Sequence, residues 1–273
     1  VSPHLCRLAR SSSSRVPPPS AAISDARRPG WAPPGWRTPA QSRCPRSLTC
    51  TEGLRSRARL TAAALAGRCV AWLTRTGLEQ ATTWDVAVHK AKRFKDQSTM
   101  ADLCCGIGID TAALSKNTSV LAIDSSSSMV RRATWNSEIL GNPSQVTGEV
   151  DDVTCREWTD WFVHADPDRR GDRPRPTRHL EAYLPDIQWM QRLIETARGG
   201  AIKVGPASNW PQHFATSSCE IDLISLAGEC REATIWFGEL AGQLSRRATN
   251  LTTGESLAGD PSLASRKIAP LDA

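Results

Sequence analysis

The sequence predicts an α/β fold built on a doubly wound, mostly parallel sheet with a terminal antiparallel hairpin. Short apolar strand patterns alternate with helical patterns from residue 98 onward, which is typical of parallel strands joined by crossover helices. A Gly-x-Gly turn follows the first of these strands. Near the end of the chain, two strand patterns flank Ala227-Gly228-Glu229, which indicates a hairpin.

The elements of this sheet can be assigned in chain order. The expected parallel strands are 99–103, 119–123, 145–150, 161–165 and 201–204, and the hairpin strands are 220–226 and 232–237. A helix is expected over 128–140, capped by Ser125 and followed by Gly141. A second helix is expected over 186–198, with Gly199-Gly200 ending it, and residues 248–251 are strand-like.

A helix is also expected before the first strand. Thr82-Thr83-Trp84-Asp85 has the form of a capping box, and apolar residues then recur at helical spacing up to Phe94. Four basic residues lie mostly off this apolar stripe: Lys90, Lys92, Arg93 and Lys95. They predict a solvated basic face, with a strip that contacts phosphates as the alternative.

Charge and composition divide the chain at residue 76. Residues 1–76 contain 13 of the 34 basic residues, only two of the 28 acidic ones, and a high density of proline and serine. They carry +11, whereas the remaining 21 basic and 26 acidic residues carry −5. We expect residues 1–76 to be a disordered leader, since such a segment buries little apolar surface. A translated stretch upstream of the true start, a tail that binds a partner and an organellar transit peptide are the alternatives for its origin.

Cysteine usage and hydropathy bound the remaining classes. The nine cysteines form no Cys-x-x-Cys pair and follow no secretory signal, so we expect reduced thiols in the cytoplasm and no metal site. No apolar run approaches the roughly 20 residues that span a bilayer, so no membrane segment is expected.

One constellation carries the candidate chemistry. Asp102, Gly106, Gly108 and Asp110 surround a strand-to-helix turn, where glycines allow a ligand to approach the backbone and the helix offers free N–H groups. The turn lacks the third glycine of the dinucleotide fingerprint and carries Asp110 two residues after its second glycine, which disfavours a nucleotide-dependent oxidoreductase and suits a ligand with an ammonium or sulfonium group.

Two further acids follow the next two strands. Asp124 comes 18 residues after Gly106, in a position to accept hydrogen bonds from ribose hydroxyls, and Asp151 is placed to reach an adenine amino group. In this order and spacing, the residues resemble the cofactor site of class I S-adenosylmethionine-dependent methyltransferases. The resemblance implies a seven-stranded, Rossmann-like domain over 98–240 after a helical segment at 77–97. It also implies Asp102 near the amino-acid end of the cofactor, Gly106 and Gly108 beneath it, Asp124 on the ribose and Asp151 at the adenine.

A closer resemblance covers residues 77–273. The segments LEQATTWDVAVHKAKRF, ADLCCGIGID, ADPDRR, AIKVGPASNW and GECREATIWFGEL are similar to a bacterial methyltransferase group with a THUMP-like C-terminal domain. The resemblance implies methylation of RNA and makes residues 241–273 the start of a THUMP-like accessory region that is truncated here. The alternative is a non-catalytic module that binds S-adenosylmethionine and recruits RNA.

The acceptor side of the site is expected after the fourth strand. Amine methyltransferases of class I carry Asn/Asp-Pro-Pro-aromatic there, whereas this chain has Asp166-Pro167-Asp168-Arg169-Arg170. Asp166 is the candidate catalytic residue, and Arg169 and Arg170 are candidates for phosphate contact. Trp210 is a candidate surface on which a base stacks. Lys203 is expected to be a solvated lysine at the strand end, with a buried lysine that faces the substrate opening as the alternative. Glu229 and Glu232 are expected to form a surface charge cluster, with an acid–base pair as the alternative.

Overall fold

The computed structural model describes residues 71–73, 75–169, 177–214 and 219–260. Arg170 and the leader up to residue 70 lie outside these residues. Across the described part, no helix is long and apolar enough to cross a membrane.

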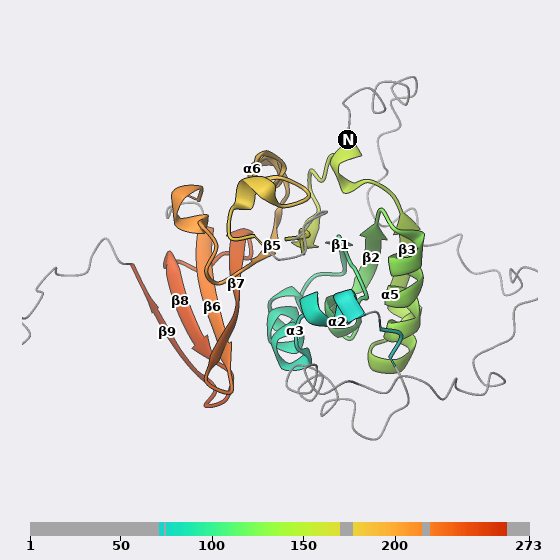
Figure 1. Ribbon diagram of the computed structural model, residues 1–273, viewed down its shortest axis with the longest axis horizontal. Coiled ribbons are helices and arrows are strands. Elements are labelled where there is room, and N and C mark those ends of the chain that lie inside the picture. Colours follow the sequence, from blue (N-terminus) through green and yellow to red (C-terminus); the bar gives the residue numbers. More distant parts are fainter. Residues whose placement is uncertain (1–70, 74, 170–176, 215–218, 261–273) are drawn as a thin grey trace, which may run out of the picture. The chain divides into compact units, whose positions relative to one another are not determined.

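A nine-stranded sheet in the order β3-β2-β1-β4-β5-β7-β6-β8-β9 forms the centre of this part (Figure 1). Its strands are β1 (Thr99–Leu103), β2 (Ser119–Asp124), β3 (Val146–Val150), β4 (Phe162–Ala165), β5 (Gly199–Val204), β6 (Cys219–Leu226), β7 (Glu229–Gly238), β8 (Arg246–Asn250) and β9 (Glu255–Gly259). Strands β1 to β5 pair in parallel, and β7 runs antiparallel to both β5 and β6. The predicted fold class is therefore confirmed, including the terminal hairpin.

Helices cover both faces of the sheet. Helices α3 (Trp84–Ala91) and α4 (Ile109–Leu114) pack with Met100, Phe162 and Trp236 on one face, where α5 (Ser127–Leu140) also places Ala133 against β2. On the other face, α6 (Ile187–Thr196) packs with Ile202 and other residues of β4, β5 and β7. Burial on both faces explains why the central strands read as short apolar runs.

Helix ends differ from the sequence expectations in three places. Ser126, not Ser125, is the residue before α5, and its side chain makes no capping hydrogen bond. Asp186 lies before α6 and caps it, because its side chain accepts from Trp189 N. Thr83, not Thr82, precedes α3 and makes no capping hydrogen bond, and the hydroxyl of Thr82 donates to Asp110 instead, so the expected capping box does not form.

The two glycines after α6 begin β5 rather than ending the helix. A Cβ at Gly200 would lie 2.2 Å from the carbonyl oxygen of Val163 on β4. The expectation of a glycine stop was wrong because the close approach of two strands, not a helix terminus, requires glycine here.

The hairpin is closed by Ala227 and Gly228, which both have positive φ, of 54° and 79°. Beyond it, β8 pairs in parallel with β6, and β9 pairs with β8. The strand expected at 248–251 is thus part of β8, and two strands extend the sheet past the expected hairpin edge (Figure 1).

The described chain begins before the boundary drawn at residue 76. Trp72 N donates to Asn136 Oδ1 at 2.7 Å, and the rings of Trp72 and Trp135 lie 4.8 Å apart. Helix α2 (Arg75–Gln80) follows. Trp72 therefore packs on α5 through its ring and two backbone groups.

Candidate functional site

The polar residues singled out in the sequence meet at the carboxyl edge of the parallel strands. Two backbone hydrogen bonds continue the ladders past the strand ends, from Asp166 N to Leu103 O at 3.1 Å and from Asp151 N to Asp124 O at 3.2 Å. This is the edge at which doubly wound sheets bind ligands. The turn after β1 lies between the ends of β2 and β4.

The glycine turn uses its two glycines differently. Gly108 has φ +78° and precedes α4, and a Cβ there would lie 2.3 Å from Ala133 Cα. Gly106 has φ +53°, and a Cβ there would meet no protein atom within 4 Å. Gly108 is therefore required by packing against α5, whereas Gly106 presents bare backbone to open space, which is the shape of a cradle for a ligand.

Asp124 is fixed beside this open backbone. Its Oδ2 accepts from Gly106 N at 3.0 Å, and its Oδ1 accepts from Ser126 N at 2.9 Å. Burial raises the pKa of Asp124 above its ordinary value, although both amides oppose the rise. Each carboxylate oxygen has a second lone pair, so Asp124 can still accept hydrogen bonds from a ligand.

The turn lies in a negative environment. Burial and the nearby carboxylates of Asp124 and Asp166 raise the pKa of the Cys104 thiol well above its ordinary value. The carboxylates of this edge therefore make the surroundings of the turn electronegative.

Asp151 lies at the end of β3 as expected, but its carboxylate already has a partner. Arg156 Nε lies 2.6 Å from Asp151 Oδ2, and the same guanidinium also pairs with Glu149. The side chain remains about one third exposed, so Asp151 can still accept a further hydrogen bond.

Asp166 pairs with a lysine at this edge. Lys203 Nζ donates to Asp166 Oδ2 at 2.8 Å and to the carbonyl oxygen of Gln80 at 3.0 Å. The expectation of a solvated Lys203 was wrong: only 5% of it is exposed, because the end of α2 and Asp166 enclose its ammonium. Gln80 Nε2 also donates to Asp168 Oδ1 at 2.9 Å, so the end of α2 binds Asp168 directly and reaches Asp166 through Lys203.

Asp102 and Asp110 bracket the turn but point into the interior. Asp102 is 1% exposed, with His164 Nδ1 2.8 Å from its Oδ1 and the hydroxyl of Thr111 donating to its Oδ2. Asp110 pairs with Lys90 at 3.0 Å. Asp110 is thus neutralised inside the protein, which overturns its interpretation as a partner for a cationic ligand.

The basic face expected on the first helix is only partly present. Lys92 and Lys95 are exposed, but Lys90 is buried and pairs with Glu232 at 3.0 Å. Arg93 donates twice to Glu220, a buried residue of β6, and stacks on the ring of Trp236. The sequence interpretations of Lys90, Arg93 and Glu232 as surface charges were wrong, because each meets an opposite charge contributed by a distant segment.

The candidate substrate residues are partly described. Arg169 lies beside Gly205 at the end of β5, where a Cβ in place of the glycine hydrogen would be 3.4 Å from Arg169 Nη1. Trp210, in the 3-10 turn η8 (Trp210–Gln212), is partly buried against the core, and the guanidinium of Arg246 lies 5.3 Å from its ring centroid. Arg246 therefore occupies one face of the ring on which a base was expected to stack.

Sequence reasoning missed His164, Thr111 and Gln80 as members of this edge. A single histidine in an apolar strand and a threonine in a short helix carry no pattern of their own. Lys90 did carry a signal: it lies three residues after Ala87 and four before Phe94, in phase with the buried stripe of α3.

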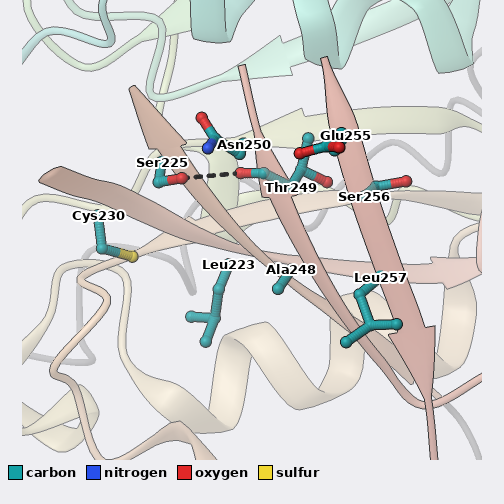
Figure 2. A pocket seen from close by; sticks show the side chains of 9 residues that line it. All are labelled: Leu223, Ser225, Cys230, Ala248, Thr249, Asn250, Glu255, Ser256 and Leu257. Carbon is teal, nitrogen blue, oxygen red and sulfur yellow. Dashed lines mark hydrogen bonds between the residues drawn. The ribbon is translucent and has the colours of Figure 1, made fainter. Parts of the chain in front are cut away.

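Away from this edge, the described residues offer no metal site but do form a surface depression. Among the described residues, no group of three or more His, Cys, Asp or Glu side chains is arranged to hold a metal, and no disulfide joins two of the five described cysteines. An open depression of about 660 Å³ lies on β6 to β9, the strands at the C-terminal end of the chain, which we call the C-terminal extension (Figure 2). Its lining comes from β6, β7, β8 and β9, and includes no residue of the candidate site: Leu223, Ser225, Cys230, Ala248, Thr249, Asn250, Glu255, Ser256 and Leu257.

Comparison with known proteins agrees with this geometry. No family model matches the chain. The uncharacterized S-adenosylmethionine-dependent methyltransferases Rv3037c and MT3122, from two strains of Mycobacterium tuberculosis, are each 33% identical over 196 residues, or 69% of this chain and 52% of the relative. The chain thus spans about half the length of these relatives.

A solved structure shares the architecture. A protein of Porphyromonas gingivalis W83, assigned as a methyltransferase, superposes with a TM-score of 0.56 over 72% of this chain and 52% of its own, at 20% identity. The strand order, the hairpin and the glycine turn beside Asp124 agree with the same architecture. The chain therefore has the fold of the class I S-adenosylmethionine-dependent methyltransferases.

Proposed function

We propose that the chain binds S-adenosylmethionine and transfers its methyl group to RNA. The observation that carries the cofactor assignment is the bare backbone at Gly106, which faces open space while its amide is held by Asp124. The curated relatives, which are named as S-adenosylmethionine-dependent methyltransferases, support the same cofactor.

The remaining groups of the edge fit that cofactor. Asp124 has free lone pairs for ribose hydroxyls, and the carboxylates around Cys104 favour the sulfonium and ammonium charges. We assign the adenine end to Asp151, held in place by Arg156. Asp102 contributes indirectly, because it supports the glycine turn and does not itself contact the cofactor.

The chemistry asks little of the protein beyond alignment. The bound cofactor supplies an activated methyl group, so the chain has to orient the acceptor in line with it and exclude water. Asp166 is the proposed acceptor-binding residue: Lys203 and the end of α2 fix one of its oxygens, and the carboxylate is 28% exposed. It accepts a hydrogen bond from the acceptor and takes up its proton if one has to leave.

RNA is proposed because basic groups follow the strand that carries Asp166. Arg169 lies at this edge, and Arg178 is exposed a few residues further along the chain. A phosphate backbone held by these groups brings a base towards the methyl group. The sequence resemblance to the group with a THUMP-like domain points the same way, and residues 241–273 are then the start of that region.

A non-catalytic module that binds the cofactor and recruits RNA is the second candidate. It is favoured by the departure from the amine-methylating motif, since Asp168 is held by Gln80 and Arg169 stands where an aromatic ring is expected.

Calorimetry with the full chain tests the cofactor first. S-adenosylmethionine and its demethylated product S-adenosylhomocysteine should bind, and NAD should not bind comparably. Asp124→Asn should weaken binding by about 1–3 kcal/mol, since it removes a charged acceptor from the ribose. The matched control is Asp152→Asn, an exposed acid that caps the next turn. Preferential NAD binding, or equal affinity in the Asp124 variant, refutes the proposal.

Transfer of tritiated methyl groups tests the reaction. Label should enter RNA of a matched extract, and Arg169→Ala should reduce it while the exposed control Arg192→Ala does not. Label in protein or small molecules refutes RNA as the acceptor. Cofactor binding without any transfer favours the non-catalytic module.

A further inference from the structure

Lys90 is a fully buried lysine whose ammonium meets three other elements. Its Nζ lies 3.0 Å from Asp110 Oδ1 on α4, 3.0 Å from Glu232 Oε1 on β7, and 3.1 Å from His164 Nε2 on β4. Only 1% of the side chain is exposed, so Lys90 has no access to a substrate. An ammonium donates three hydrogen bonds and accepts none, so these three contacts use its donors completely.

This arrangement fixes the tautomer of His164. Because Nε2 faces an ammonium donor, it has to accept, and the ring carries its proton on Nδ1. Nδ1 then donates to Asp102 Oδ1 at 2.8 Å. The other oxygen of Asp102 accepts from the hydroxyl of Thr111.

The resulting chain of contacts joins both ends of the glycine turn. Asp102 lies two residues before Cys104, and Asp110 lies two residues after Gly108. Lys90 holds Asp110 directly and Asp102 through His164, and Thr111 on α4 closes the ring back to Asp102.

We propose that Lys90 is a positioning residue that, through His164, Asp102, Asp110 and Thr111, holds the glycine turn in the shape that receives the cofactor. The inference rests on the proposed function for the identity of that ligand. It assigns Asp102 and Asp110, the two acids that bracket the turn, to the support of the turn rather than to contact with the ligand. We call this set of five residues the Lys90 clamp.

The charges around Lys90 explain why this one lysine can support the whole set of residues. Although burial alone would raise it, the Lys90 ammonium holds the pKa of Asp110 well below its ordinary range. Both Asp110 and Glu232 are nearly inaccessible to water, so without the ammonium each would be a buried charge that lacks its main partner. Lys90→Met is therefore expected to lose stability together with ligand binding.

A gentler variant separates positioning from folding. Thr111→Val keeps the size of the side chain and every charge, but it removes the tie between α4 and Asp102. Thr111→Ser restores the hydroxyl and should rescue. The matched control is Thr249→Val, since Thr249 is also buried and donates to a buried carboxylate, Asp222 Oδ1, at 2.8 Å, in the C-terminal extension.

The test compares these variants in the full chain by thermal unfolding, by calorimetry with S-adenosylhomocysteine, and by hydrogen exchange of the amides of residues 104–110. Thr111→Val should weaken binding about five- to tenfold and accelerate exchange in the turn. Thr249→Val should lower the unfolding temperature similarly but leave both other readouts unchanged. Lys90→Met should accelerate exchange at least as much.

Equal binding and equal exchange in Thr111→Val and wild type would overturn the clamp. If wild type itself binds no S-adenosylhomocysteine, the proposed function fails, but exchange still decides the clamp. Faster exchange confined to the turn in Thr111→Val then supports it, and unchanged exchange refutes it.

Discussion

Glu220→Gln should lower the free energy of unfolding by about 3 kcal/mol at neutral pH. Glu220 is 1% exposed on β6 and accepts two hydrogen bonds from Arg93, one from Arg247 Nε at 2.6 Å and one from Gly242 N at 2.6 Å. Although burial opposes it, the two guanidinium groups lower the pKa of Glu220 from its usual 4.5 to about 2. Each unit of pKa corresponds to about 1.36 kcal/mol, which gives the expected loss.

The pH dependence of this effect has a definite sign. Because the folded-state pKa of Glu220 is depressed, its contribution is complete above about pH 4.5 and disappears as the pH falls towards about 2. Urea denaturation of wild type and variant between pH 7 and pH 3 should therefore show a difference in unfolding free energy that shrinks below about pH 4.5. Glu229→Gln is the control, because the carboxylate of Glu229 is exposed although its partner Arg231 is largely buried, and it should change stability by less than about 0.5 kcal/mol. A Glu220 variant as stable as wild type, or a difference that does not change with pH, would refute the reasoning.

Three further outcomes are expected. Gly108→Ala should prevent stable folding, because the added Cβ would meet α5 and the residue has a left-handed backbone conformation. Gly106→Ala should fold but lose affinity for S-adenosylhomocysteine. Circular dichroism measures the folding and calorimetry the affinity, and equal effects of the two substitutions would contradict the assignment. Cys104 should react slowly with iodoacetamide at pH 8, because burial and nearby carboxylates raise the pKa of its thiol. Peptide mapping compares its rate with that of the exposed Cys155, and equal rates would contradict the negative environment of the turn. Ala227→Asn should raise stability by about 0.5–1 kcal/mol, because Asn-Gly suits a turn with two positive φ angles; a lower melting temperature would contradict it.

The sequence alone was sufficient for the order of the elements. The parallel strands, α5, α6 and the hairpin follow from apolar periodicity and turn residues, which are local properties of the chain. The positions of Gly106, Asp124 and Asp166 at one edge follow as well, since carboxyl ends of neighbouring parallel strands must meet. The ends of helices were less predictable, as at Gly200, where a neighbouring strand rather than the helix requires glycine.

The partners of the charged residues could be decided only by the tertiary structure. Lys90, Glu232 and Lys203 read as surface charges in sequence, yet each is buried against an opposite charge from another element. Whether a lysine is solvated or buried depends on which distant carboxylate the fold brings to it, and no local pattern encodes that distance. The same reason separates Asp124, which is only partly buried at the sheet edge, from Asp102, which is 1% exposed and enclosed by His164 and Thr111.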